Sequence, residues 1–140
     1  MALQDTIAAL DAYVPTGDEH EDVARLDAIT DELGTIEQVQ AATPALLRIF
    51  ERHPHALLGS PGPVVHCIER TGLETCLPML LQSFTAHPAR MTLWMLERCL
   101  RSSPAPQSRA SILRSLHAVR PAPRGSELAD DIDEVLGEHR

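Results

Sequence analysis

The chain has 140 residues and a formal net charge of −8, and 44% of its residues are hydrophobic although only four are Phe, Trp or Tyr. It has no apolar run of the roughly 20 residues that cross a bilayer, and residues 1–5 lack the basic-then-apolar order of a signal peptide. Three cysteines in a chain without export signals are expected to be reduced and buried. We therefore expect a cytoplasmic protein outside the membrane, with a single domain, 1–140, and an all-α fold packed by aliphatic side chains.

The first forty residues predict two helices. Apolar residues at three- and four-residue steps define the buried face of the first helix, which we expect to run from Leu3 to Val14 and to stop at Pro15: Leu3, Ile7, Leu10 and Val14. A polar link over 16–22 places acids at the start of the second helix, where they suit the helix dipole. Its buried face is expected to include Val23, Leu26, Ile29 and Leu33, with Gly34 as a C-terminal stop.

The middle of the chain predicts a break at residues 43–44. Residues 35–42 are expected to form a short helix or turn with Ile36 and Val39 facing inward. Thr43 followed by Pro44 is then a cap with proline in the first turn, opening a helix that ends near His53. Residues 55–63 form an irregular, proline-rich turn, and the next helix covers about 63–72.

Four more helices complete the prediction. Three are expected over 73–86, 89–101 and 107–119, and Ser126 caps a last acidic helix. Pro78 either delays the start of the 73–86 helix to about Leu77 or kinks it.

An internal repeat organises these helices. Residues 46–54 match 80–88 at an offset of 34, and 112–121 follow at a further 32; in the same way 67–70 match 95–98. A period in the low thirties with two apolar-faced segments per unit is typical of stacked helix pairs. The sequence predicts a short right-handed α-solenoid of about eight helices in HEAT-like pairs.

Charge is distributed unevenly along the chain. Residues 1–40 have ten acids and one Arg (net −9), residues 41–125 have four acids and ten Arg (+6), and residues 126–140 have six acids and one Arg (−5). An acidic balance without a concentrated Arg stripe argues against nucleic acid as a direct ligand and favours a basic protein partner. Candidate contact residues are the acids of the second helix, weighed against an ordinary solvated face: Asp18, Glu19, Glu21, Asp22 and Asp31.

Three residues of the middle are further contact candidates: His66, Glu69 and Trp94. His66 follows the rigid 59–63 turn, where its ring can face a groove or simply bond a backbone carbonyl. Trp94 is the only tryptophan; such a residue either packs in the core or anchors an interface.

No catalytic or cofactor motif is present in the sequence. Gly-rich phosphate loops, nucleophile elbows and zinc-protease motifs are missing. Cys67 and its neighbour His66 point about 100° apart on one helix and so cannot act as a pair, and the two imidazoles of His53-Pro54-His55 lack further ligands at finger spacing. We expect no enzyme activity, no cofactor and no metal.

Several segments together resemble a known class of proteins. The segments are Phe50-Glu51-Arg52-His53-Pro54, then Gly59-Ser60-Pro61-Gly62-Pro63-Val64-Val65-His66 with Glu69, and Thr92-Leu93-Trp94-Met95-Leu96 with Arg98. They resemble small helical immunity proteins of bacterial polymorphic toxin systems, including contact-dependent growth inhibition. The likeness covers about 43–101, and it identifies a scaffold and transfers no contact residue.

The resemblance implies a protein that binds and neutralises the C-terminal domain of a cognate toxin, a nuclease being the toxin type that best suits an acidic inhibitor. The alternative is a non-catalytic helical-repeat adaptor that holds another protein or a peptide in its groove. A HEAT-like lyase is a third possibility, which the missing cluster of acid, base and aromatic residues disfavours.

Overall fold

The computed structural model describes residues 2–119 and 126–139, and all regular secondary structure in these residues is helical. The helices are α1 (Leu3–Ala12), α2 (Glu19–Thr30), α3 (Ile36–Arg52), α4 (Gly62–Glu69), α5 (Leu73–Ala86), α6 (Arg90–Arg101), α7 (Pro106–Val119) and α8 (Glu127–Glu138). The expected all-α class is confirmed. None of these helices is both long and apolar enough to span a membrane.

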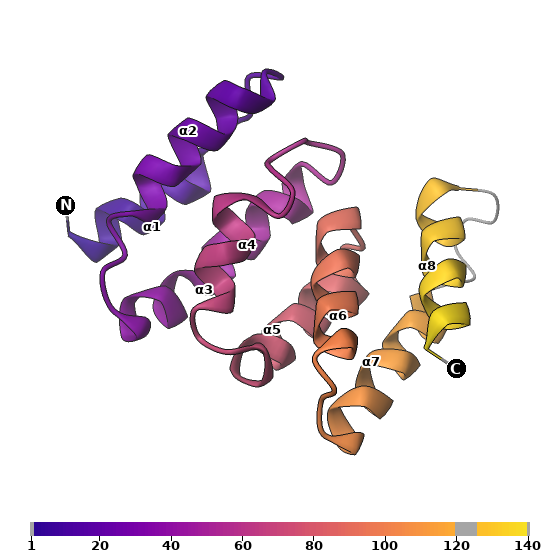
Figure 1. The fold of residues 1–140 in the computed structure, drawn as a ribbon. Coiled ribbons are helices and arrows are strands. Elements are labelled where there is room, and N and C mark those ends of the chain that lie inside the picture. The colour runs from indigo at the N-terminus through magenta and orange to yellow at the C-terminus, as the bar shows by residue number, and fades with distance from the viewer. Residues whose placement is uncertain (1, 120–125, 140) are drawn as a thin grey trace.

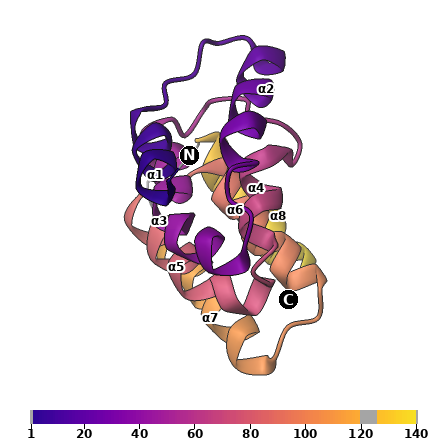
Figure 2. The same cartoon turned by 90° about the vertical axis from the view of Figure 1, so that its left-hand side faces the viewer.

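The helices lie in two rows. Each odd-numbered helix packs against the next odd-numbered one, α1 on α3, α3 on α5 and α5 on α7, and Figure 2 shows these four along one side of the molecule. In the even-numbered row α2 packs on α4 and α8 on α6, while α6 also packs on α5. The first and last helices therefore lie at opposite ends of the stack (Figure 1).

The sequence repeat coincides with the odd-numbered row. Leu46 and Phe50 of α3 align with Leu80 and Phe84 of α5, and all four side chains are at most 1% exposed. The third copy places Ile112 and Leu116 of α7 at the same positions, and both are fully buried. The repeat thus records the apolar face that each odd-numbered helix turns toward its neighbours.

The predicted break at Thr43–Pro44 is wrong, because α3 continues from Ile36 to Arg52 with Pro44 inside it. The start signal lies earlier, where Thr35 and Gln38 form a complete capping box. Pro44 lies on the exposed side of the helix, so water can reach the carbonyl that its missing N–H leaves unbonded. Ile36, expected to face inward, is 40% exposed at this new helix start.

The first helix also ends earlier than predicted. Tyr13 already has an extended backbone after α1. Pro15 disfavours helical geometry at Val14, so the helix could not have continued to Val14 as expected. The ring of Tyr13 turns inward and is 2% exposed, whereas Val14, expected on the buried face, is 62% exposed. Likewise, α2 ends at Thr30 rather than at Gly34, although Leu33 remains buried.

The helix expected over 73–86 is α5, which begins at Leu73 and includes Pro78 in its second turn. A glycine makes this start possible: Gly72 has a φ of +91°, a backbone conformation that only glycine adopts at little cost, and it separates α4 from α5. The late start at Leu77 is excluded.

Candidate functional site

A groove of about 390 Å³ opens between three elements: the loop between α3 and α4, helix α6, and helix α8. We call it the α6–α8 groove. Its apolar lining includes Leu57 of the loop, Met91 and Trp94 of α6, and Val135 of α8. Leu57 is 66% exposed, and Met91 and Trp94 are half-buried. Large apolar side chains left open to solvent in a concave site are characteristic of binding surfaces.

The loop that forms one wall of the groove is firmly held. Leu58, next to the exposed Leu57, is only 1% exposed. Gly59 has a φ of +101°, and a Cβ atom added there would lie 2.4 Å from the Cα of Gly62, so no other residue fits this close backbone approach. The peptide bond between Ser60 and Pro61 is cis. Because Leu58 is buried and the backbone of Gly59 packs against Gly62, we take this wall to be preformed.

Charged side chains from α6 and α8 surround the apolar lining. Arg90 pairs with Asp131 at 3.4 Å, and Arg101 pairs with Glu97 at 3.1 Å and with Glu138 at 3.5 Å. Glu134 also lines the groove, is exposed, and makes no ion pair with the described residues. Four carboxylates against two guanidinium groups give the lining a net charge of −2.

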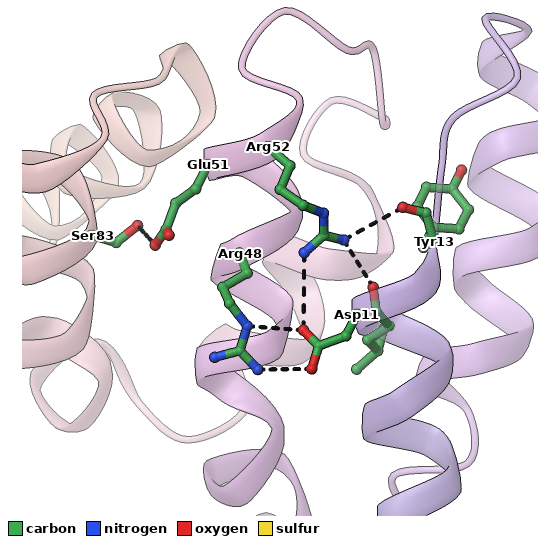
Figure 3. A network of polar contacts seen from close by, with 7 residues as sticks. Asp11, Tyr13, Arg48, Glu51, Arg52 and Ser83 are labelled. Atoms are coloured by element: carbon green, nitrogen blue, oxygen red, sulfur yellow. Dashed lines mark hydrogen bonds and ion pairs between the residues drawn. The ribbon is translucent and has the colours of Figure 1, made fainter.

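Seven of the eight arginines of residues 41–119 bond to another helix or to the segment next to one, although most of their side chains remain exposed; Arg114 contacts only Ser111 within α7. Arg48 makes a bidentate ion pair with Asp11 at 2.8 and 3.0 Å, and Arg52 donates to the carbonyls of Leu10 and Tyr13 (Figure 3). The same kind of contact ties other helices through Arg70 to the Leu33 carbonyl, Arg98 to Glu69, Arg90 and Arg101 to α8, and Arg109 to the His139 carbonyl. The positive charge of residues 41–119 thus stabilises helix packing.

The acids of α2 divide into a structural one and several exposed ones. Asp22 is 2% exposed and accepts hydrogen bonds from the Tyr13 hydroxyl (2.9 Å), from the Thr16 amide (2.8 Å) and hydroxyl, and from the Gly17 amide. Burial raises the pKa of the Asp22 carboxyl, but the hydrogen bonds from Thr16 and Tyr13 outweigh it and hold the pKa below its ordinary value. Burial and the bond to Asp22 raise the pKa of Tyr13.

Asp22 is therefore unavailable to a partner, because its carboxylate holds the link between α1 and α2 in place. Asp18 caps α2 by accepting from the Glu21 amide at 3.2 Å and remains exposed. Glu19, Glu21 and Asp31 are also exposed. Together they make the exposed surface around α2 acidic, on a different helix from the groove.

The structure separates the three candidates from the middle of the chain. Trp94 lines the α6–α8 groove. His66 is exposed on α4 and does not line it. Glu69 accepts from Arg98 at 2.7 and 2.9 Å, and its side chain is 14% exposed, so it ties α4 to α6. The sequence does not indicate the remaining groove residues, because they come together only when the α3–α4 loop, α6 and α8, which are distant in the chain, meet in space.

The three cysteines have no features of a reactive site. Cys67, Cys76 and Cys99 are buried, as predicted, and all three are free thiols. Burial raises the pKa of Cys76 to about 11 and that of Cys99 to about 12. Thiolates would be scarce at neutral pH, so these side chains serve as small apolar residues of the core.

One group within the described residues has the spacing of a metal site. Ligand atoms of Glu97, Glu138 and His139 lie within 4.8 Å of one another. The guanidinium of Arg101 contacts both carboxylates, however. It already neutralises the charge that would attract a divalent cation, which makes this group a poor metal site.

Comparison of the chain with protein-family models, with curated proteins and with solved structures finds no match. The groove and the distribution of charge are the features of this molecule that indicate a function.

Proposed function

We propose that this chain is an immunity protein that binds and neutralises the C-terminal domain of a cognate contact-dependent growth inhibition toxin, without catalytic activity of its own. The observation on which this depends is the separation of charge. Seven of the eight arginines of residues 41–119 already bond to a carboxylate or a carbonyl of another element, whereas acids such as Glu19, Glu21 and Glu134 are exposed and have no ion pair among the described residues. The exterior therefore attracts a positively charged protein.

The proposal includes the finer architecture. The two rows of helices, with the repeat along the odd-numbered row, support a short right-handed α-solenoid of HEAT-like pairs in one domain. Such a scaffold offers a broad preformed surface, and the rigid wall at Gly59 fits this role. Little rearrangement is then needed when the partner docks.

A nuclease is the toxin type that we propose, because a channel that binds nucleic acid must be basic. An acidic inhibitor of a nuclease gains speed from this difference in charge, since electrostatic steering raises association rates by factors of about 10 to 1000. Rapid capture matters for a protein that must block a toxin inside its own cell. We accordingly place the protein in the cytoplasm.

The test is direct binding to the C-terminal domain of the protein encoded by the reading frame immediately upstream. The expected result is a 1:1 complex by size-exclusion chromatography with light scattering, and survival of cells that express the toxin domain together with this chain. The proposal fails if the two purified proteins form no complex and co-expression gives no protection.

A matched variant tests the charge argument separately. Replacing Glu19, Glu21 and Asp31 by Arg reverses three exposed acids and leaves the structural Asp22 intact. We expect the association rate to fall by about tenfold or more at low salt, with a smaller change at high salt. Equal association rates for the variant and the parent protein would show that steering by α2 is wrong.

The second candidate function is an adaptor for another protein or peptide, which the open apolar groove with Trp94 favours. Protection of toxin-expressing cells separates the two, because an adaptor would bind without protecting.

A further inference from the structure

We propose that the α6–α8 groove holds one short segment of the protein partner, in which a large apolar side chain lies next to a lysine or arginine. The inference depends on the proposed function and adds to it the surface that retains the partner and the chemistry that this surface selects.

The apolar half of this recognition comes from Leu57, Met91 and Trp94. They line one continuous groove, and Leu57 is the most exposed large hydrophobic side chain among the described residues. Tryptophan is enriched among the residues that dominate binding energy, and such residues lie in pockets from which the partner excludes water. An apolar side chain of the partner that covers Leu57 and Trp94 removes this exposed surface from solvent.

The preference for a basic residue of the partner comes from the charged side chains around the lining. Its two arginines are already paired, Arg90 with Asp131 and Arg101 with Glu97 and Glu138. Glu134 remains exposed and, within the part of the chain that the structure describes, without an ion pair, and the lining has a net charge of −2. A cation that enters finds an open carboxylate, whereas an acidic segment would be repelled.

The acidic surface of α2 cannot replace the groove as the retaining surface. The exposed residues of this helix are charged, polar or small, and the exposed large apolar side chains Val14 and Ile36 lie beyond its two ends. Exposed charges mainly change the association rate, while buried apolar anchors determine how slowly a complex dissociates. We therefore infer that α2 raises the rate at which the partner associates and that the groove slows its dissociation.

Trp94 supplies the measurement, because it is the only tryptophan of the chain and lies in the groove. The probes are the purified upstream-encoded domain and short tryptophan-free peptides tiled along it. We expect the peptides that combine Leu, Ile, Met or Phe with an adjacent Lys or Arg to shift the emission of Trp94 to shorter wavelength in a saturable way. The same peptides with Glu in place of the basic residue should give no shift.

Two variants and a matched control locate the contact. Glu134→Arg reverses the open carboxylate, and Leu57→Asp removes the exposed apolar side chain; both positions are exposed, so the fold tolerates them. Asp130→Arg makes the same charge change on α8 outside the groove. We expect Glu134→Arg and Leu57→Asp each to raise the Kd of the whole domain by about tenfold or more through faster dissociation, and Asp130→Arg by much less.

The outcomes separate this inference from the proposed function. If the domain binds and protects, but Glu134→Arg and Leu57→Asp leave the Kd and the Trp94 emission unchanged, the groove is not the retaining surface and the proposed function stands. If the domain does not bind at all, both the inference about the groove and the proposed function fail. A Trp94 shift that follows the chain's own concentration, with a dimer that Leu57→Asp dissolves, would overturn the inference in favour of a second copy as the occupant.

Discussion

Arginine–carboxylate pairs join both ends of the stack to the middle helices, but the two ends are packed differently. At each end, arginines of the middle helices bond to an acidic terminal region: Arg48 to Asp11 of α1, and Arg90 to Asp131 of α8. The N-terminal end contributes Leu10, Tyr13 and Leu26, at most 2% exposed, to the hydrophobic core that it shares with the other helices, and it has the buried Asp22 network. At the C-terminal end α8 buries Ala129, Ile132 and Val135, as many residues as α2 does, but a groove opens beside it.

This difference shows how an acid of α2 comes to stabilise the fold, whereas an acid of α8 remains exposed to a binding partner. The N-terminal end fills the space between its helices with side chains and uses one of its acids to hold a loop. At the C-terminal end, α8 lies beside α6 with the groove between them, and Glu134 stays open to solvent. A binding surface is therefore expected at the end that is packed less completely.

The largest test of this comparison is a pair of core truncations. Leu26→Ala should lower the free energy of unfolding by about 3 to 5 kcal/mol, because Leu26 is fully buried in the N-terminal end. Ile132→Ala removes an equally buried side chain, but the adjoining groove allows α8 to collapse onto the gap, so we expect about 2 kcal/mol. Urea unfolding followed by circular dichroism measures both, and equal losses would contradict the proposed difference in packing.

The second test concerns the buried carboxylate. Asp22→Asn keeps the size but replaces an acceptor of several hydrogen bonds, and we expect the Tm to fall by roughly 5 °C. Tyr13→Phe removes one of these bonds and should cost about 1 kcal/mol. Glu134→Gln is the matched control at the C-terminal end, with no expected change in Tm.

The third test is acid sensitivity. The side-chain bond from Arg48 holds the pKa of Asp11 below its ordinary value of 3.8, and the pKa of Asp22 is also lowered. Since the folded pKa values are the lower ones, the unfolded chain binds more protons in acid; the stability is complete above 3.8 and is lost as the pH falls through the folded values. Hydrogen exchange between about pH 5 and pH 3 should show the α1–α2 end opening before α8. Simultaneous opening would contradict this order.

The smallest expected effects are those of the ion pairs. Arg48→Gln breaks a bidentate pair and should cost about 0.5 to 1 kcal/mol. Arg101→Gln breaks two pairs of a side chain that is 61% exposed, and we expect less than about 0.5 kcal/mol. Thermal unfolding of both variants is measured at low and at high salt. The stability that is lost on removing an ion pair decreases as the salt concentration rises. A larger loss for Arg101→Gln would reverse the comparison.

Local sequence patterns predicted much of the fold. The repeat located the buried faces of α3, α5 and α7, and Ser126 caps α8 as expected by accepting from the Ala129 amide. The error at Pro44 arose because proline was given more weight than the continuous apolar face from Val39 to Phe50. Tertiary packing outweighed the local preference.

The candidate site was less predictable. Trp94 was identified because it is the only tryptophan, but its neighbours Leu57 and Glu134 come from a loop and a helix far away in the chain. The acids of α2 look equivalent in the sequence, yet only Asp22 is buried, with donors that the 13–17 link supplies. Such roles depend on which segments meet in space, and one sequence does not contain that information.

The interhelical contacts of the stack have a chemical consequence, because all twelve basic residues are arginine and lysine is missing. A guanidinium keeps its proton at any pH that a cell can reach, so alkaline conditions do not discharge these contacts. Acetyltransferases that modify side-chain amines have no substrate in this sequence. The helices are therefore held together by cations that cellular chemistry of this kind cannot neutralise.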